Sequence, residues 1–305
     1  MTAASSQTCE IPVVLPESGY FLATVHILYV INISGNFLLT GRSQKVVFMI
    51  RLGRQAFLSA ALCAVIAGPA LAAGTHHVSE YSITLAGLPI AKATFATDME
   101  SRGYTIAGNF RSAGIASILS DISAKFTVTG ALQSDRLSAD KYSLVYKTGK
   151  RTRTYDVTYK NGNVTDSVTV PPPRPRPASW VPVSEQDLRA VLDPISGLIF
   201  PADSPVCPRT VPIYDGESRM DLVLSKKGKD KFSTDGFKGE VIVCTVRYVP
   251  KSGFRKGRSD VEFLKKAEME VWFAKADTVN VYAPVYARIP TRIGPVYVTA
   301  VKYGD

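Results

Sequence analysis

Apolar and polar residues alternate in short segments from residue 78 onward, and Gly, Asn, Asp and Pro separate these segments. A period of two places successive side chains on opposite faces of a strand, so the pattern predicts half-buried β-strands. Tyr155, Val157 and Tyr159, for example, would share one face. The predicted strands are Val78–Leu85, Ile90–Thr97, Tyr104–Ser112, Ile122–Leu132, Tyr142–Lys147, Thr152–Tyr159, Thr210–Tyr214, Met220–Ser225, Gly239–Val249, Ala267–Ala274, Asn280–Ile289 and Pro295–Tyr303.

Two turn dipeptides and one proline run separate some of these strands. Asn161-Gly162 and Asp215-Gly216 are typical of two-residue hairpin turns, and a further strand is expected after the first of them. Residues 171–177, PPPRPRP, predict an extended crossing, because proline fixes φ and offers no amide to a ladder. We expect one domain, since each half alone supplies only half of a curved sheet.

One helix is expected after the proline run. Ser184 can cap its first turn, with Asp187 three residues later, and Asp193-Pro194 would end it. Its apolar stripe is Leu188, Val191 and Leu192. The predicted fold is therefore mainly β: a long curved antiparallel sheet, or a partly open barrel, with one short helix packed on or inside it.

Residues 49–72 have the three-part layout of a secretory signal peptide. Basic residues precede an apolar run, Ala56–Ala67, and the small-residue pattern Ala-Leu-Ala follows at residues 70–72. The run is shorter than the about 20 residues that a membrane-spanning helix needs. We expect cleavage after Ala72, a mature β-rich domain at residues 73–305, and a periplasmic location.

Residues 1–48 then need a separate explanation, because a signal peptide works from the N-terminus. A start codon assigned too far upstream is the simplest one. The alternative is a transmembrane segment at residues 20–39, which is long enough but contains polar residues.

Composition fits a globular protein, with 46% hydrophobic and 20% charged residues and a net charge of +10. Of the Cys residues, Cys207 and Cys244 are the pair that falls in the mature domain. In an oxidising compartment this pair predicts a disulfide, which would close a loop of about 37 residues. Two separate buried thiols are the alternative.

Common catalytic motifs are absent from the sequence: it contains no phosphate loop, dinucleotide fingerprint, Gly-x-Ser-x-Gly elbow or His-Glu-x-x-His helix. We therefore expect no enzyme activity and no cofactor. We also expect no metal site, since His76 and His77 fall on an expected flexible terminus. A carbohydrate-active hydrolase is the alternative, because four carboxylates could face one another across strands. They are Glu217, Asp221, Glu268 and Glu270.

Two basic stretches are expected to join neighbouring strands, Lys226–Lys231 and Lys251–Arg258. Export makes nucleic acid an implausible partner, which leaves lipid, lipopolysaccharide or an envelope protein. The alternative is a set of solvated hairpin loops. The candidate basic residues are Lys226, Lys227, Lys229, Lys251, Arg255, Lys256 and Arg258.

Aromatic residues in the last strands are candidates to line an apolar cavity inside the curved sheet. Ordinary core packing is the alternative. The candidates are Trp272, Phe273, Tyr282, Tyr286 and Tyr297.

Several phrases of the sequence point to a family. They are Tyr81 followed by Gly87-Leu88-Pro89-Ile90, Asp193-Pro194-Ile195-Ser196-Gly197-Leu198, Tyr214-Asp215-Gly216 with Arg219–Leu222, Cys244 with Arg247-Tyr248-Val249-Pro250 and Gly253-Phe254, and Thr291-Arg292-Ile293-Gly294. The chain resembles, from about Ser79 to Tyr303, a family of exported proteobacterial proteins of unknown function, DUF3108. The resemblance implies an exported β protein and carries over no functional residues. Ser218 departs from it, where a basic residue is expected after the Asp-Gly turn.

We therefore expect a non-enzymatic periplasmic protein of the cell envelope that binds a lipid-like or other apolar ligand, or a protein partner. A hydrolase and a pure interaction module are the alternatives. The sequence leaves the ligand and the oligomeric state open.

N-terminal sequencing of the exported protein tests the expected processing. The first residue should be Ala73, because Ala72 ends the small-residue cleavage pattern. An intact Met1 would contradict both the cleavage and the interpretation that the start codon is assigned too far upstream.

Overall fold

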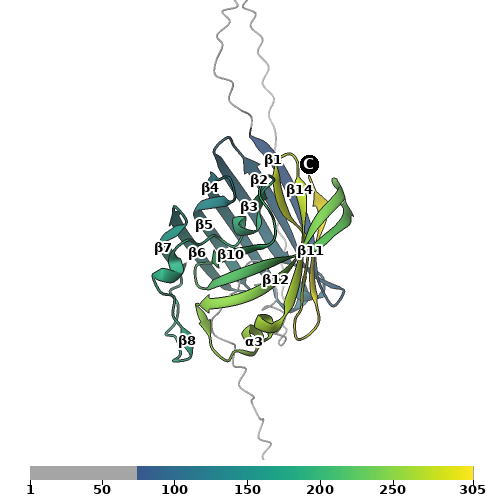
Figure 1. Cartoon of the computed structure of the whole chain (residues 1–305). Coiled ribbons are helices and arrows are strands. Elements are labelled where there is room, and N and C mark those ends of the chain that lie inside the picture. Colours follow the sequence, from purple (N-terminus) through teal and green to yellow (C-terminus); the bar gives the residue numbers. More distant parts are fainter. Residues whose placement is uncertain (1–73, 305) are drawn as a thin grey trace, which may run out of the picture.

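One long antiparallel sheet makes up most of the molecule (Figure 1). The computed structural model describes residues 74–304. The predictions for residues 1–48, for the transmembrane alternative at 20–39 and for the signal peptide at 49–72 lie outside the described residues. Within them the fold is mainly β, as the alternating pattern predicts.

The first half of the domain forms strands at every predicted position, most of them extended by a few residues at their ends. They are β1 (Thr75–Leu85), β2 (Leu88–Met99), β3 (Gly103–Ser112), β4 (Ile122–Leu132), β5 (Leu137–Thr148), β6 (Arg151–Lys160) and β7 (Asn163–Val170). The short helix α2 (Ile115–Leu119) lies between β3 and β4. The strand expected after Asn161-Gly162 is β7, and Asn161 and Gly162 adopt the positive φ angles of a hairpin turn, 53° and 75°.

The second half adds the remaining strands. They are β8 (Trp180–Val181), β9 (Phe200–Pro201), β10 (Arg209–Tyr214), β11 (Arg219–Thr234), β12 (Phe237–Ser252), β13 (Phe254–Arg255), β14 (Glu268–Ala276), β15 (Val281–Ile289) and β16 (Val296–Tyr303). The helical elements here are the 3₁₀ turns η2 (Gln186–Leu188) and η3 (Ser196–Leu198) and the helix α3 (Ser259–Lys266).

The two halves share one sheet of 14 strands, with β1 and β16 paired at its centre. Its order is β10-β11-β12-β14-β15-β16-β1-β2-β3-β4-β5-β6-β7, and β9 pairs with β15. The β1–β16 register runs from Ser79 opposite Tyr303 to Leu85 opposite Val296. This ladder makes the chain one structural unit, as expected from sequence.

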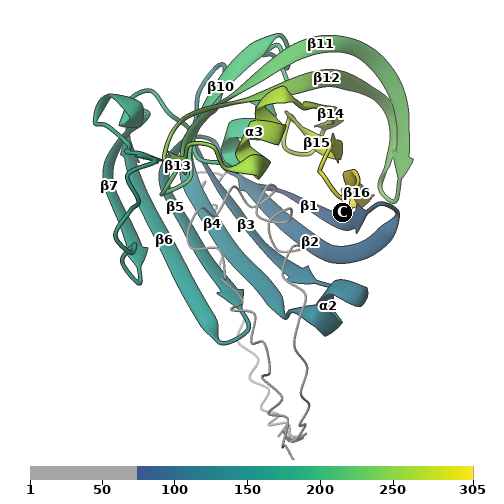
Figure 2. The same cartoon turned by 90° about the horizontal axis from the view of Figure 1, so that it is seen from below.

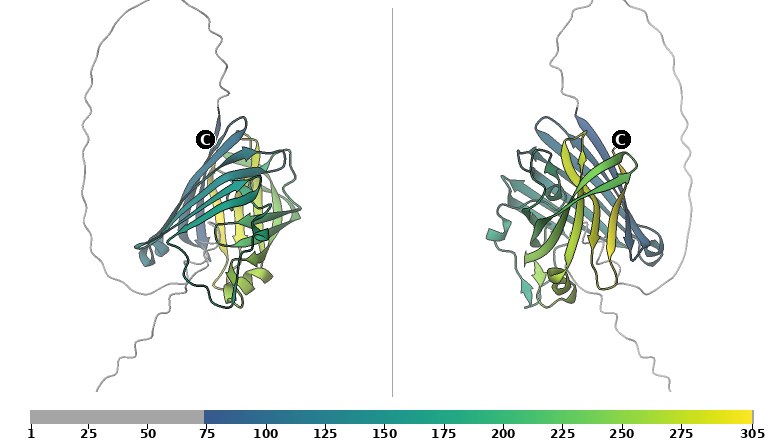
Figure 3. Two further views of the ribbon diagram at one scale, coloured as in Figure 1. Left: turned by 90° about the vertical axis from the view of Figure 1, so that its left-hand side faces the viewer. Right: turned by 45° about the vertical axis from the view of Figure 1, so that its right-hand side comes forward.

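The sheet curves back on itself around an apolar core (Figure 2). Strands β1 to β7 form a broad layer, and the long hairpin of β11 and β12 arches over the opposite side, around β14, β15 and β16 (Figures 2 and 3). The alternation of the sequence fixes which side chains face inward: along β1, Tyr81 and Ile83 are buried, whereas Glu80 is exposed.

The two ends of the sheet are not joined by a backbone ladder, because β7 and β10 each pair with a single main-sheet neighbour. The main chain of Val191 and Leu192 bridges this seam, with hydrogen bonds to Gly162 on one side and to Pro212 of β10 on the other, and side chains span it as well. The Tyr159 hydroxyl on β6 donates a hydrogen bond to the Tyr214 carbonyl at 3.0 Å, and the Tyr214 hydroxyl lies 3.1 Å from the Ser167 hydroxyl of β7. The sheet is therefore a partly open barrel with a polar seam.

The proline run crosses between β7 and the small β8–β13 pair. Arg176 anchors it: its guanidinium forms a salt bridge with the buried Glu217 and lies 4.1 Å from the ring centroid of Trp180. The crossing is thus fixed to the domain by charge and by stacking.

The prediction of a helix after the proline run is wrong. The capping contacts are present, since the Ser184 N–H donates to the Asp187 carboxylate at 2.9 Å and the Asp187 N–H donates to Ser184 Oγ at 3.3 Å. Only the 3₁₀ turn η2 follows. Ala190, just after this turn, has a φ of 51°, which prevents the backbone from continuing as a helix.

The neighbouring strands explain why no α-helix forms there. The Val191 N–H donates to the Gly162 carbonyl at 2.8 Å, and the Leu192 N–H donates to the Pro212 carbonyl on β10 at 2.8 Å. In an α-helix these two amides would bond within the helix, and the Gly162 and Pro212 carbonyls would lose their donors. Tertiary hydrogen bonds therefore override the local helical pattern.

The basic stretches also differ from expectation. Lys226–Lys231 lies inside β11 rather than in a loop, and residues 251–258 lead through β13 into α3, which was not predicted. In α3, Asp260 and Glu262 occupy the first turn and Lys265 and Lys266 the last, an arrangement that complements the helix dipole.

Cys207 and Cys244 form a disulfide, as the sequence predicts. Cys207 lies just before β10 and Cys244 lies in β12, so the bond crosses over β11 and fixes three strands together.

Replacing both cysteines by Ala should lower the free energy of unfolding by about 3 to 4 kcal/mol, because the disulfide closes a loop of 37 residues in the unfolded chain. Guanidinium denaturation measures this. Wild-type protein treated with a reductant is the control and should fall to the same stability; a double variant as stable as the oxidised protein would contradict the assignment.

Candidate functional site

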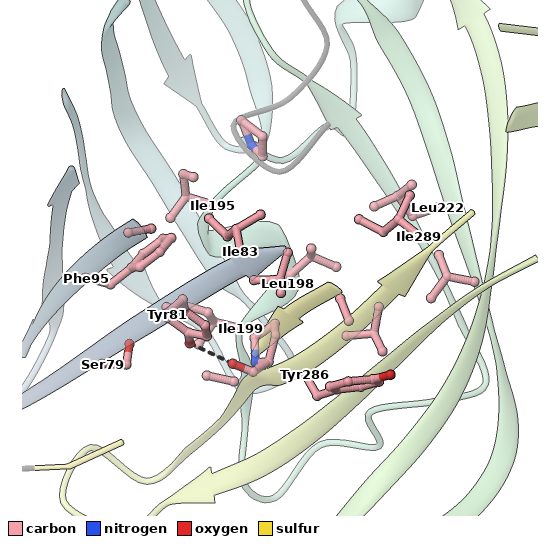
Figure 4. Close-up of a pocket in the computed structure, with 18 of the residues that line it drawn as sticks. Ser79, Tyr81, Ile83, Phe95, Ile195, Leu198, Ile199, Leu222, Tyr286 and Ile289 are labelled. Carbon is pink, nitrogen blue, oxygen red and sulfur yellow. Dashed lines mark hydrogen bonds between the residues drawn. The ribbon is translucent and has the colours of Figure 1, made fainter. Parts of the chain in front are cut away.

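An apolar cavity of about 160 Å³ lies between the curved sheet and η3 (Figure 4). Its walls come from β1, β2 and β15, from the ends of β11, β12 and β14, and from the η3 segment. Figure 4 shows Ile83 and Phe95 on one side and Leu222 and Ile289 on another, with Leu198 of η3 between them. The cavity occupies the space enclosed by the sheet's curvature.

Strand register brings the lining residues together. Tyr81 of β1 lies opposite Ala93 of β2, and Ile83 lies opposite Ala91, so large residues on β1 face small ones on β2. This pairing of large with small side chains leaves room above the sheet for the cavity.

An aromatic series forms the floor of the cavity. The ring centroids of Tyr81 and Phe95 are 5.4 Å apart, and those of Phe95 and Phe126 are 5.0 Å apart. Gly108 makes this series possible, because a Cβ at that position would collide with the Phe126 ring. The Tyr81 hydroxyl donates to the Pro284 carbonyl at 2.7 Å, and burial raises the pKa of Tyr81 to about 12. Tyr81 therefore remains a neutral part of the wall.

Asp193 holds the η3 segment that closes one side of the cavity. Its fully buried carboxylate accepts hydrogen bonds from the Ile195 N–H at 2.8 Å and the Ser196 N–H at 2.9 Å, and from the Ser196 hydroxyl. Tyr104 of β3 in turn donates to Ser196 Oγ at 3.0 Å. This network places Ile195 and Leu198 against the cavity.

The lining is chemically simple. Among the described lining residues there is no Asp, Glu, Lys or Arg, and 21 of the 27 have wholly apolar side chains. The exceptions are three tyrosines and a group made of His77, Ser79 and Thr97. A lining with so few polar side chains suits an aliphatic chain.

The position of His77 corrects one expectation. His76 and His77 lie in β1 rather than on a flexible terminus, and Nδ1 of His76 lies 2.6 Å from a carboxylate oxygen of Asp98. His77 points inward and is 5% exposed. Alternation along β1 could have revealed this, had the strand been begun three residues earlier.

The five aromatic candidates separate into three groups. Tyr286 lines the cavity (Figure 4), and its ring stacks with Trp272 at 4.8 Å and with Tyr297 at 6.2 Å. Trp272 and Tyr297 lie outside the lining. Phe273 is fully buried against Phe200, at 5.5 Å, and Tyr282 pairs with Phe200 across β15 and β9.

Three of the four candidate carboxylates are held by separate cations. Glu268 is exposed at the start of β14. Acids that are each paired with a different cation act as structural ion pairs between strands and turns. The pairs are Glu217 with Arg176, Asp221 with Arg219 and Lys251, and Glu270 with Lys227.

The candidate basic residues are likewise largely neutralised by acids. The Arg255 side chain donates to Ser179 Oγ at 3.2 Å, and Lys226 is exposed on β11. The ion pairs are Lys227 with Glu270, Lys229 with Glu240, Lys251 with Asp221, and Arg258 with Asp260.

Within residues 74–304, no group of three or more His, Cys, Asp or Glu side chains is placed to hold a metal ion. No helix in this part of the chain has the length and hydropathy needed to cross a membrane.

Replacing Asp193 by Asn should flatten the pH dependence of stability. Burial raises the pKa of Asp193, so the folded protein binds this proton more tightly than the unfolded chain does. The resulting stabilisation is complete below the ordinary pKa of about 4 and is lost as the pH rises through the folded pKa. Denaturant titrations at a series of pH values from 4 upward should show wild-type stability falling relative to Asp193→Asn; parallel curves would contradict the assignment.

Comparison with known proteins gives a family and a structural likeness. No curated protein matches the chain. A crystal structure titled as a beta-barrel-like protein of domain of unknown function DUF1849 from Brucella abortus is similar over 75% of this chain and 97% of that one, with 10% identity and a TM-score of 0.43. The family model described as "Protein of unknown function (DUF3108)" matches residues 80–301. The resemblance read from the sequence is therefore confirmed, and the chain belongs to the DUF3108 family.

Proposed function

We propose that this protein is an exported, non-catalytic protein of the cell envelope that binds a lipid-like ligand in its internal cavity. The observation that carries the proposal is the partly open apolar cavity of about 160 Å³ on the inner face of the curved sheet. Export is inferred from the signal-like sequence of residues 49–72 and fits the disulfide.

The size and the lining of the cavity support this ligand class. One buried water needs about 10 to 15 Å³ and two to four polar partners. The cavity is on the order of ten times larger, and most of its wall offers no hydrogen bond, so water would be held poorly there. An aliphatic chain that enters the cavity removes its own apolar surface from water, which contributes about 25 cal/mol for each Å² buried.

The charged residues support a non-catalytic protein. Glu217, Asp221 and Glu270, which a hydrolase would use as paired carboxylates, each have their own cation, and none of them lines the cavity. A hydrolase instead needs two carboxyl groups facing each other at about 5 to 10 Å across a substrate cleft.

An interaction module is a second candidate, favoured by the outer edge of β7. This strand ends the sheet, and Val168 and Val170 on it are 45% and 54% exposed. It contains no Lys, Arg or Pro, the residues that commonly protect such an edge. Ligand binding and partner binding are compatible, because the edge and the cavity lie on different parts of the sheet.

Filling the cavity tests the ligand-binding proposal. Val298→Phe adds a ring into the cavity, whereas Val301→Phe on the same strand, β16, adds it at an exposed position. Isothermal titration with methyl decanoate should give at least about tenfold weaker binding for Val298→Phe, a loss of about 1.4 kcal/mol, and unchanged binding for Val301→Phe.

Leu198→Trp provides a second filled variant, on η3 rather than on the sheet. Thermal unfolding identifies any variant that fails to fold. Native mass spectrometry of wild-type protein purified from cells should also show a bound lipid-sized mass. The proposal fails if the wild-type protein is empty and binds no methyl decanoate, or if both filled variants fold and bind as the wild type does.

A further inference from the structure

The polar lining residues other than tyrosine lie together in the cavity. Of its lining residues other than tyrosine, His77, Ser79 and Thr97 alone carry side-chain hydrogen-bonding groups among the described residues. We call these three residues the polar corner. Figure 4 shows Ser79 next to Tyr81 along the same strand, away from Leu222 and Ile289.

Strand geometry assembles the polar corner. His77 of β1 lies directly opposite Thr97 of β2 in the antiparallel register. Ser79 is two residues further along β1 and therefore faces the same side of the sheet. Directly paired side chains have Cβ atoms about 4.5 to 5.5 Å apart, so the three polar groups lie side by side on the same stretch of cavity wall.

The inward face of β1 changes in character along the strand. It passes from His77 and Ser79 to Tyr81 and then Ile83, and on β2 Thr97 is followed inward by Phe95. A cavity with one polar stretch and a long apolar remainder matches an amphiphile with one chain and one small head.

Each residue of the polar corner is withdrawn from solvent: His77 is 5%, Ser79 6% and Thr97 6% exposed. Nδ1 of His77 lies 3.4 Å from Thr278 Oγ1, and its ring meets Tyr303 edge to face at 4.5 Å. These contacts fix the imidazole beside the cavity wall. A ligand head group that reaches this wall can exchange hydrogen bonds with the three side chains.

We propose, building on the apolar-ligand function above, that the polar corner binds the carboxyl group of a single-chain fatty acid. A carboxyl group accepts several hydrogen bonds, and the Ser79 and Thr97 hydroxyls and the His77 imidazole are donors of the right reach. The absence of Lys and Arg from the described lining disfavours a phosphate head group, which carries more charge and is usually paired with those cations. The acyl chain then extends toward Leu222 and Ile289.

The experiment compares two ligands that differ only at the head. Decanoic acid and methyl decanoate have the same chain, but the ester lacks the acid proton and the negative charge. Isothermal titration of the wild-type protein should show decanoic acid binding at least about tenfold more tightly than the ester, because hydrogen bonds to an ionised group are the stronger ones.

Variants locate the preference. Ser79→Ala with Thr97→Val removes both hydroxyls with little change of shape, and the acid-to-ester affinity ratio should fall to about one to three. His77→Phe keeps a ring and removes its nitrogens, and should also lower the ratio. The matched control is Ser82→Ala with Thr94→Val, which makes the same changes on the same two strands but on the outward face, and should keep the wild-type ratio.

The outcomes separate this proposal from the one it rests on. If methyl decanoate binds as tightly as decanoic acid, the polar corner is not a carboxyl site, and the apolar-ligand function stands. If the acid is preferred but the Ser79/Thr97 double variant keeps the preference, the head group lies elsewhere and the proposal is overturned. If neither ligand binds the wild-type protein, both proposals fail.

Discussion

The pairing of β1 with β16 is the constraint on which the rest of the structure depends. The first and last strands of the domain lie next to each other at the middle of the sheet, so everything between them must fold outward in two arms that curve toward one another. The ladder joins residues more than two hundred positions apart. Closing so long a loop costs conformational entropy, and the apolar area that the two arms bury together offsets this cost. The cavity is the space that the arms leave between them.

The cavity owes its shape to a few specific choices of residue. Small residues on β2 and the missing side chain at Gly108 make room for an aromatic floor, while the buried Asp193 fixes η3 above it. A hydrophobic core without such devices would close by packing large side chains into one another, and the protein would gain stability by doing so. These residues therefore keep the cavity open, although filling it with side chains would make the protein more stable.

Much of the fold could be predicted from the sequence, because period-two alternation is a local property that the sheet preserves. Strand β4 was predicted with its observed bounds, and the Asn161-Gly162 turn and the disulfide were predicted as well. The helix at Ser184 was wrong because Val191 and Leu192 hydrogen-bond to distant strand edges, which local propensity cannot anticipate. The cavity lining was missed for a related reason: alternation tells which residues face inward, but which inward residues meet depends on strand order and register. Aromatic content pointed to Trp272 and Tyr297, whereas the space lies among aliphatic residues of β1, β15 and η3.

The seam between β7 and β10 distinguishes this sheet from a closed barrel. The diameter of a closed barrel is set by its strand number and stagger, through an unbroken ring of main-chain hydrogen bonds. Here Tyr214 meets Ser167 and Tyr159 through side-chain contacts, and the main chain of residues 191–192 bonds to Gly162 and to Pro212. The girth of the sheet is therefore set partly by these few contacts, whose residues lie outside the cavity lining and can vary independently of it.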